Sequence, residues 1–447
     1  MAALAVVTPG AAHAEALLVV EADTGKVLQA DNATMPWYPA SVTKIMTAYV
    51  ALKAVKEGRM SLDTLLTVSP VAASQSPSKM GFPPGTQVTI DNALKMMMVK
   101  SANDMAVVIA EGVGGSVDGF SAMMNQAAQK LGMTQTSYVN PNGLPADGQI
   151  TSARDLAILA RAVIRDLPEY EYFMHIHSIR YGRRVTQNFN KLIGRYPGAD
   201  GFKTGFICAS GYNLVASATR NGKRLIAVVL GSTSGHARAV RAAQILDRGF
   251  GGSGLSWLKP ELGTVDSLAP IDATPPNLRD EMCNGKRKRP ATDEDADVVA
   301  ANGNGSTGES PVMFFTAGLQ PPAGKPSDLI AAAPEPSEPI PVYTGPTKTG
   351  TALIAAVAAE AEKQASRRGK KSKIAAKKPD AAKPKVEAGA KSAAVRHASV
   401  KPEAAAKPSA SAEKKPAAKP AAAEKPAPKP AKPNAATKPK GENKPAG

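Results

Sequence analysis

Cysteine is scarce in this sequence, and long apolar runs are absent. The 447 residues include two cysteines, Cys208 and Cys283. Two cysteines provide neither the disulfide framework of a small secreted domain nor the ligand spacing of a zinc site, and we do not expect them to pair. No apolar stretch reaches the ~20 residues that cross a bilayer, so the sequence predicts no membrane-spanning helix.

Histidine is also scarce, which limits the bases available for catalysis. Of the five histidines, His13 lies near the N-terminus, His397 lies in the C-terminal segment, and His236 precedes a predicted helix. His175 and His177 alternate on one predicted strand face, where an HxH metal site or a Ser-His-Asp triad is one interpretation. Solvated histidines on a strand surface are far commoner, so we predict no metal and no cofactor.

Positive charge is concentrated in residues 351–447. This segment holds 23 Lys and Arg against 8 Asp and Glu, or +15 of the chain's net charge of +17. It consists mostly of Ala, Lys and Pro and lacks the large apolar side chains that offset chain entropy. We therefore expect a disordered basic tail, which is either a solvated spacer or a ligand for anionic envelope polymers or lipid head groups. The remaining charge is small, so no specific nucleic-acid binding is expected.

Residues 1–14 end in Ala12-His13-Ala14, a small-residue pattern typical of a signal-peptide cleavage site. A basic region before the apolar run is missing, and the run is short, so a flexible N-terminus is the alternative. We interpret 1–14 as the remnant of a signal peptide and expect an exported protein in the periplasm or cell envelope of a bacterium.

Periodic patterns in residues 15–253 predict an α+β domain. Strands at its start and end surround a helical middle, which favours an antiparallel sheet packed with a helical subdomain. The strand patterns cover 15–32, 174–190 and 201–232, the last with an Asn221-Gly222 hairpin turn. The helical patterns cover 41–55, 90–113 with a break at 100–104, 119–131, 152–165 and 237–250. Residues 254–350 are rich in Pro and Gly, and we interpret them as a linker.

Ser41 and Lys44, in "YPASVTKIMTAYV", lie three residues apart at the start of a predicted helix. This spacing places both side chains on one face, within reach of proton transfer, and the exposed N–H groups of a first helical turn favour an alkoxide. A capping serine beside a solvated lysine is the alternative. The same Ser-x-x-Lys pattern recurs at three other places. Pro77 interrupts the copy at Ser76/Lys79, while Ser256/Lys259 lies in the linker and Ser411/Lys414 in the tail.

Two further motifs favour a catalytic pair. Ser101-Ala102-Asn103 lies at the break in a helical pattern, and Lys203-Thr204-Gly205 opens a predicted strand. A second Lys-Thr-Gly, at 348–350, lies in the predicted linker. The ordered set Ser-x-x-Lys, Ser-x-Asn, Lys-Thr-Gly is the signature of penicillin-binding proteins and serine β-lactamases.

Around these motifs, residues 15–253 resemble the D-alanyl-D-alanine carboxypeptidases, the low-molecular-mass penicillin-binding proteins of peptidase family S11. The segments that carry the resemblance are "YPASVTKIMTAYVAL", "KSANDMAVVIAE", "VNPNGLPADGQITSARDLAILAR" and "DGFKTGFICASGYNLVASA". The resemblance implies a serine β-lactamase/DD-peptidase-like fold. It also implies that Ser41 attacks the penultimate D-alanine of the peptidoglycan stem pentapeptide while Lys44 takes its proton. Ser101 would relay a proton to the leaving D-alanine, and Asn103 would orient the substrate amide and Lys44.

The same resemblance implies how the substrate is held. Lys203 and Thr204 would bind the terminal carboxylate, with Arg238 as a second contact. Gly205 would let the substrate backbone lie against the strand edge, and the N–H groups of Ser41 and Phe206 would form the oxyanion hole. No cofactor is implied, and β-lactam antibiotics would acylate Ser41. Many relatives have an additional β-rich domain and an amphipathic membrane helix. The sequence pattern of 254–447 predicts neither of them.

Three alternatives use the same residues differently. A β-lactamase would need a glutamate-held water, for which Glu169 and Glu171 lie in the right half of the chain but in no familiar loop motif. A D,D-endopeptidase would share the whole site. A non-catalytic wall-binding protein would act through its tail, but the intact motif residues argue against a decayed site.

Overall fold

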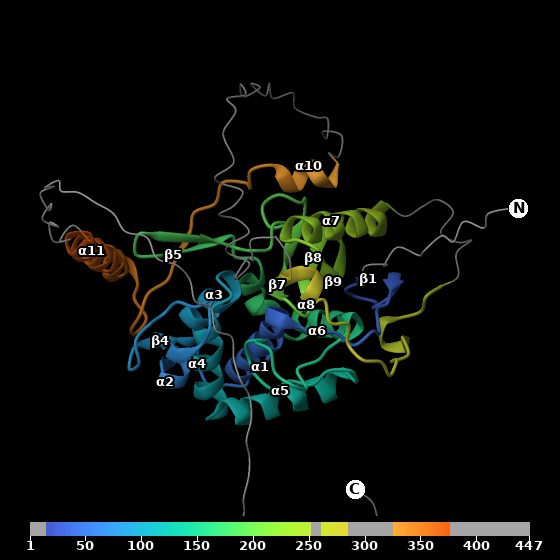
Figure 1. Ribbon diagram of the computed structural model, residues 1–447, viewed down its shortest axis with the longest axis horizontal. Helices are drawn as coiled ribbons and strands as arrows, with labels where there is room; N and C mark the ends of the chain where they lie inside the picture. Colours follow the sequence, from blue (N-terminus) through green and yellow to red (C-terminus); the bar gives the residue numbers. More distant parts are fainter. Residues whose placement is uncertain (1–14, 252–260, 285–324, 376–447) are drawn as a thin grey trace, which may run out of the picture. The chain divides into compact units, whose positions relative to one another are not determined.

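A five-stranded antiparallel sheet forms the centre of the domain, in a computed structural model that describes residues 15–251, 261–284 and 325–375. The sequence interpretations of residues 1–14, 285–324 and 376–447 lie outside the described residues. The strand order is β2-β1-β9-β8-β7 (Figure 1), which confirms the predicted antiparallel sheet. Its strands are β1 (Ala16–Glu21), β2 (Val27–Asp31), β7 (Ala199–Ile207), β8 (Gly211–Arg220) and β9 (Lys223–Ser232).

Alternation along the strands gives the sheet two apolar faces. In β1, Leu18 and Val20 contribute to one core cluster and Leu17 and Val19 to the other, as expected because successive strand residues point to opposite faces. Helix α7 (Gly235–Gly251) covers the face with Leu17 and Val19, while α1 (Lys44–Lys56) and α6 (Ala153–Asp166) pack on the opposite face. Both faces are therefore buried.

The helical subdomain follows the predicted pattern, including the break between α3 and α4. Side chains of Thr89, Ser116 and Ser152 cap α3, α5 and α6 by accepting backbone N–H groups. The short helix η1 (Ala40–Thr43) leads directly into α1. The other helices of this region are α2 (Pro70–Ser74), α3 (Ile90–Val99), α4 (Asn103–Gly114), α5 (Val117–Leu131) and η2 (Pro168–Met174).

The structure also contains two smaller sheets. A two-stranded sheet pairs β3 (Leu65–Thr67) with β4 (Gln87–Thr89). A three-stranded sheet has the order β10-β5-β6, with β5 (Ser178–Tyr181), β6 (Arg184–Gln187) and β10 (Ile340–Pro341). The β5–β6 hairpin confirms the strand pattern predicted around the Tyr-Gly turn, and the parallel β10 comes from the segment interpreted as linker.

Part of the predicted linker packs on the domain. Residues 261–284 include η4 (Val265–Ser267) and α8 (Arg279–Cys283), and the side chains of Val265, Leu278 and Met282 are buried. Contrary to our expectation, Cys208 and Cys283 form a disulfide, with 5.7 Å between their Cα atoms. The cysteines meet because the N–H of Leu278 donates to the carbonyl of Ala209, which brings α8 to the end of β7.

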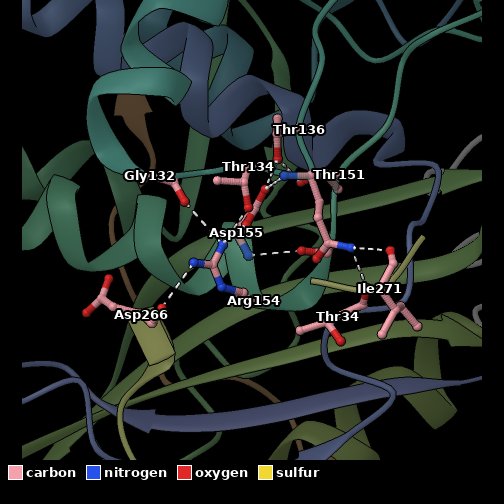
Figure 2. A network of polar contacts seen from close by, with 11 residues as sticks. Thr34, Gly132, Thr134, Thr136, Thr151, Arg154, Asp155, Asp266 and Ile271 are labelled. Atoms are coloured by element: carbon pink, nitrogen blue, oxygen red, sulfur yellow. Dashed lines mark hydrogen bonds and ion pairs between the residues drawn. The ribbon is translucent and has the colours of Figure 1, made fainter. Parts of the chain in front are cut away.

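A network of polar contacts holds residues 266–271 against the domain (Figure 2). Arg154 and Asp155, both on α6, form an ion pair of 2.7 Å, and Arg154 also donates to the carbonyl of Asp266. The side-chain amide of Gln135 donates to the carbonyls of Thr34 and Ile271. Burial raises the pKa of Asp155 despite the donors around it. Since buried charges are stable only with partners, the network specifies one position for residues 266–271.

Residues 325–375 also pack against the domain rather than forming a plain linker and tail. Helix α10 (Pro326–Ala331) buries Ile330 near α7, and Val342 and Tyr343 are buried. Helix α11 (Gly350–Ala375) begins in the region predicted to be disordered, and Gln364 accepts the N–H of Arg183. Among the described residues, no helix combines the length and apolar character of a membrane span.

The disulfide closes a loop of 75 residues, so it should stabilise the fold mainly by restricting the unfolded chain. We expect the Cys208→Ser/Cys283→Ser double variant to lose about 2–4 kcal/mol of unfolding free energy, measured by urea denaturation. Reductant should lower the unfolding free energy of the wild type to that of the variant and leave the variant unchanged. Equal stability of reduced and oxidised wild type would contradict the role assigned to the disulfide.

Candidate active site

Ser41, Lys44 and Asn103 meet in one hydrogen-bonded group. The Lys44 Nζ lies 2.9 Å from the Ser41 Oγ and 2.7 Å from the Asn103 Oδ1. Lys44 is the first residue of α1, and its side chain is fully buried. The separation of Nζ and Oγ permits direct proton transfer from the serine hydroxyl to the amine. The structure therefore brings together the first pair and the asparagine of the second motif.

A third acceptor for Lys44 comes from a loop to which the sequence analysis assigned no role. The Nζ donates to the backbone carbonyl of Asn142 at 2.7 Å, so an ammonium group here has an acceptor for each of its three N–H bonds. A buried ammonium without acceptors would cost several kcal/mol. These acceptors allow Lys44 to occupy the interior in either protonation state and fix the position of its nitrogen.

The turn that presents Ser41 is strained and tightly packed. Ala40 has a φ of +50°, a conformation that costs an L-residue with a Cβ about 1–2 kcal/mol. The turn is held from β8, because the side-chain amide of Asn213 donates to the carbonyls of Tyr38 and Pro39. It is also held from the Asn142 loop: a Cβ on Gly143 would lie 1.8 Å from the Ala40 carbonyl oxygen, so only glycine fits there.

The Asn142 and Asn213 contacts were not predicted, although their segments were quoted for the family resemblance. "NPNGLP" carries the Asn-Gly turn signal, which indicates a turn but not its partner. Asn213 lies within a largely buried strand and is itself fully buried. A buried asparagine needs hydrogen-bond partners. A polar residue at a buried strand position was therefore the sequence signal that could have indicated a structural role for Asn213.

Ser101 and Asn103 lie at the junction of α3 and α4. Ser101 is buried and has a φ of +58°, the second strained residue of the site. Asn103 begins α4, and its backbone N–H donates to the carbonyl of Ser78 while its side-chain amide donates to the carbonyl of Ser76. These donors orient the Asn103 Oδ1 toward Lys44.

Lys203 and Thr204 lie on β7, the edge strand of the main sheet, and both are buried. The Lys203 Nζ donates to the Thr204 carbonyl at 3.0 Å. The Thr204 Oγ1 is buried and has no hydrogen-bond partner within the described residues. An unsatisfied buried hydroxyl is costly, so Thr204 is a candidate to bind a ligand oxygen.

Gly205 lies directly against the turn that carries Ser41. A Cβ at this position would lie 2.7 Å from the backbone nitrogen of Ser41 and 3.0 Å from that of Val42. The side chain would therefore collide with the turn that carries Ser41. Gly205 lets η1 pack directly against β7.

Phe206 lies on β7 and Arg238 on α7. The ring of Phe206 stacks on that of Tyr212, with centroids 4.2 Å apart. Arg238 lies on α7, is buried, and donates to the carbonyls of Asn213 and Phe189. Since Asn213 pairs with Gly205 across the strands, Arg238 is connected to the site through β8.

The glutamates and histidines weighed in the sequence analysis have other contacts. Glu169 forms an ion pair of 3.0 Å with Lys56, which lies twelve residues and about 18 Å along α1 from Lys44. Glu171 pairs with Arg224. His175 ends η2 and His177 precedes β5, so the pair does not lie on a strand face as expected. Burial lowers the pKa of His177. Within the described ranges, no cluster of three or more His, Cys, Asp or Glu side chains could hold a metal ion.

The sequence is similar to those of D-alanyl-D-alanine carboxypeptidases. A family model described as D-alanyl-D-alanine carboxypeptidase matches residues 3–234. The chain is 39% identical over 245 residues to the D-alanyl-D-alanine carboxypeptidase DacC of Escherichia coli, covering 53% of this chain and 61% of the relative. It is 35% identical over 244 residues to DacF of Bacillus subtilis, covering 53% and 62%. The chain thus spans about three fifths of these relatives.

Solved structures show the same fold. Penicillin binding protein 5 from Haemophilus influenzae is 35% identical, with a TM-score of 0.52 over 55% of this chain and 73% of that one. Penicillin binding protein 6B from Escherichia coli is 34% identical, with a TM-score of 0.51 over 54% and 79%. The expected DD-peptidase-like α+β fold is confirmed.

The packing of η1 on β7 gives a test of the site's geometry. We expect Gly205→Ala to displace Ser41 and to reduce its acylation by a fluorescent penicillin at least tenfold, since a displacement of about 1 Å at a reacting group costs about 100-fold. Gly251→Ala is the matched control, because nothing lies within 4 Å of a Cβ at that position. Unchanged labelling of folded Gly205→Ala would show that the contact with Ser41 is unimportant.

Proposed function

The chain belongs to the D-alanyl-D-alanine carboxypeptidase family, peptidase family S11, and on that premise we propose that it removes the terminal D-alanine from peptidoglycan stem pentapeptides. The enzyme is a serine-type carboxypeptidase that forms an acyl-enzyme on Ser41 and binds penicillins. The observation that carries the proposal is the buried Lys44 Nζ, 2.9 Å from the Ser41 Oγ and held by Asn103 and Asn142.

Acylation uses Lys44 as the base. In its neutral form Lys44 accepts the proton of the Ser41 hydroxyl, and the Oγ attacks the carbonyl carbon of the penultimate D-alanine. The N–H groups of Ser41 and Phe206 stabilise the oxyanion. Asn103 and Asn142 keep the Nζ in place during the transfer, so the proton moves over a fixed distance. Ser101 relays the proton to the nitrogen of the leaving D-alanine.

Recognition of the terminal carboxylate makes the enzyme an exopeptidase. The Lys203 ammonium supplies the charge and the Thr204 Oγ1 supplies a hydrogen bond that the protein itself does not use. Arg238 is the candidate for a second contact with the carboxylate. A substrate without a free carboxylate would lack both the attraction to the Lys203 ammonium and the hydrogen bond from the Thr204 hydroxyl.

Water then hydrolyses the acyl-enzyme, so the reaction has two steps on one serine. A penicillin acylates Ser41 in the same way, and its adduct is released slowly. The ion pairs of Glu169 with Lys56 and of Glu171 with Arg224 favour this outcome over a β-lactamase, because neither glutamate is available to hold a deacylating water at Ser41.

We further propose that the protein is exported to the periplasm or cell envelope. The relatives come from bacteria, the substrate is a polymer outside the inner membrane, and a Cys208–Cys283 disulfide is stable in an oxidising compartment. The positive charge of residues 351–447 would then favour contact with anionic envelope polymers or lipid head groups.

The catalytic pair is tested with Ser41→Ala and Lys44→Met. We expect both to lose D-alanine release from a pentapeptide by at least about 1,000-fold, since the pair acts as a unit, and Ser41→Ala to lose fluorescent-penicillin labelling. Ser61→Ala, an exposed serine, is the control. Rapid turnover of the label without D-alanine release would indicate a β-lactamase. Full activity of Ser41→Ala would refute the mechanism.

The role of Thr204 is tested with Thr204→Val and Thr204→Ser. The valine removes the hydroxyl at nearly constant volume, so kcat/KM for a pentapeptide with a free carboxylate should fall about tenfold or more, whereas serine should retain activity. For the same peptide with an amidated terminus, wild type and Thr204→Val should be equally poor. An equal loss by both variants on both peptides would indicate a purely structural role.

A further inference from the structure

A cavity of about 230 Å³ lies between the β5–β6 hairpin, the start of the second motif and α11. Lys100, which directly precedes Ser101, lines it together with Met80, and Gln364 of α11 forms a further wall. The hairpin completes the lining with four residues: Ile179, Tyr181, Arg184 and Thr186. The proposed reaction uses none of these side chains.

The hairpin presents one face to the cavity. Ile179 and Tyr181 are two residues apart on β5, and Arg184 and Thr186 are two residues apart on β6, so each pair points to one side of its strand. The register places Tyr181 opposite Arg184 and Ile179 opposite Thr186. All four side chains therefore lie on the face that lines the cavity.

This hairpin is held on two sides. The ring of Tyr181 packs edge-on against that of Phe82, with centroids 5.2 Å apart. On the other side α11 lies along the hairpin (Figure 1), where Gln364 accepts the N–H of Arg183 and its amide donates to the carbonyl of Tyr181, both at 3.1 Å. These contacts fix the strands that carry the cavity-facing side chains.

Two positive side chains face the cavity. Lys100 is only 5% exposed, and its Nζ lies 3.4 Å from the Ser78 Oγ. Arg184 is exposed, and among the described residues neither its guanidinium nor the Thr186 hydroxyl has a hydrogen-bond or ion-pair partner. The hairpin wall therefore offers a guanidinium and a hydroxyl whose donors the fold does not use.

Two carboxylates contact residues of the lining, and both have donors from the protein. Glu360 accepts the hydroxyl of Tyr181 at 2.9 Å. Asp104 accepts the backbone N–H groups of Met80 and Gly81 at 3.1 and 2.8 Å. Neither carboxylate lines the cavity, and none of the described lining residues is acidic. The described side chains that face this space thus carry a net positive charge.

The chemistry of these groups favours a phosphate group as the ligand. A guanidinium donates to two phosphate oxygens at once, and a lysine adds a compact positive charge. A hydroxyl donates to a further oxygen, which a tetrahedral anion offers in a third direction. One water needs only about 10–15 Å³ of such space, so the cavity has room for a phosphate group and several waters.

We propose that this cavity is a phosphate-binding site, which takes either free phosphate or the phosphodiester of an anionic lipid head group. Arg184 binds two oxygens, Thr186 donates to a third, and Lys100 balances the charge from the opposite wall. The site adjoins the second motif, since Lys100 precedes Ser101 and its carbonyl accepts the Ser78 hydroxyl. It shares no side chain with the reaction, so it does not depend on the proposed carboxypeptidase function.

The test is a calorimetric titration of the full-length protein with inorganic phosphate, at pH 7 and at an ionic strength held constant with chloride. We expect Arg184→Ala to weaken phosphate binding at least tenfold and Thr186→Val to weaken it about threefold. Arg183→Ala is the matched control, because Arg183 is the neighbouring exposed arginine and does not line the cavity. Its phosphate affinity should equal that of the wild type, and the basic tail contributes equally to all four proteins.

Thermal unfolding without phosphate should be the same for Arg184→Ala and the wild type, since the side chain is exposed. Equal phosphate affinity of Arg184→Ala and the wild type, or an equal loss in Arg183→Ala, would overturn the proposal. Co-sedimentation with phosphatidylglycerol vesicles, against phosphatidylcholine vesicles, then identifies the source. Weaker sedimentation of Arg184→Ala than of Arg183→Ala would indicate a lipid head group, and equal sedimentation alongside the loss of inorganic phosphate binding would indicate free phosphate.

Discussion

The site depends on the burial of one lysine nitrogen at the meeting point of three chain segments. The Lys44 Nζ is hydrogen-bonded to one oxygen atom from each segment: η1, the start of α4 and the Asn142 loop. Each segment is held in turn by the domain core, and each brings one polar atom to a place that excludes water. The cost of burying an amine without partners therefore acts as a constraint on the whole helical subdomain, since a shift of any of the three segments would remove an acceptor.

A second constraint joins this helical side to the sheet. The turn that presents Ser41 lies directly against β7, where Gly205 leaves room for its backbone. The nucleophile comes from one side of this contact, and the side chains of Lys203 and Thr204 come from the other. Because the contact is between two backbones, with no flexible side chain between them, the distance from Ser41 to Thr204 is set by the fold itself. The strained φ of Ala40 is tolerated because Asn213 and Gly143 hold the turn from both sides.

The fold and the motif residues could be predicted from the sequence because they depend on local patterns. Alternation in β7 to β9, the Asn-Gly turn and the break before Asn103 are all properties of short windows. What could not be predicted depends on contacts between distant residues. Asn142 acts through its backbone carbonyl, which carries no residue signature. Cys208 and Cys283 were not expected to pair, because nothing near Cys283 signals that Leu278 binds Ala209. Residues 254–350 look like a linker by composition, yet Val265, Ile330 and Val342 are buried one at a time against the domain.

This difference separates two kinds of structural element around the site. The groups that carry the chemistry lie on elements whose other faces form the main core, so they are fixed by large apolar areas. The segments after residue 260 are fixed by single buried side chains, a few backbone hydrogen bonds and one disulfide. Their backbone bonds nevertheless reach the sheet, since Val27 in β2 donates to the carbonyl of Gly263 and Leu278 donates to that of Ala209, just after β7. Because β2 and β7 are the two edge strands, this part of the chain meets the sheet at both edges. A change in it can therefore be transmitted to β7, the strand against which the Ser41 turn packs.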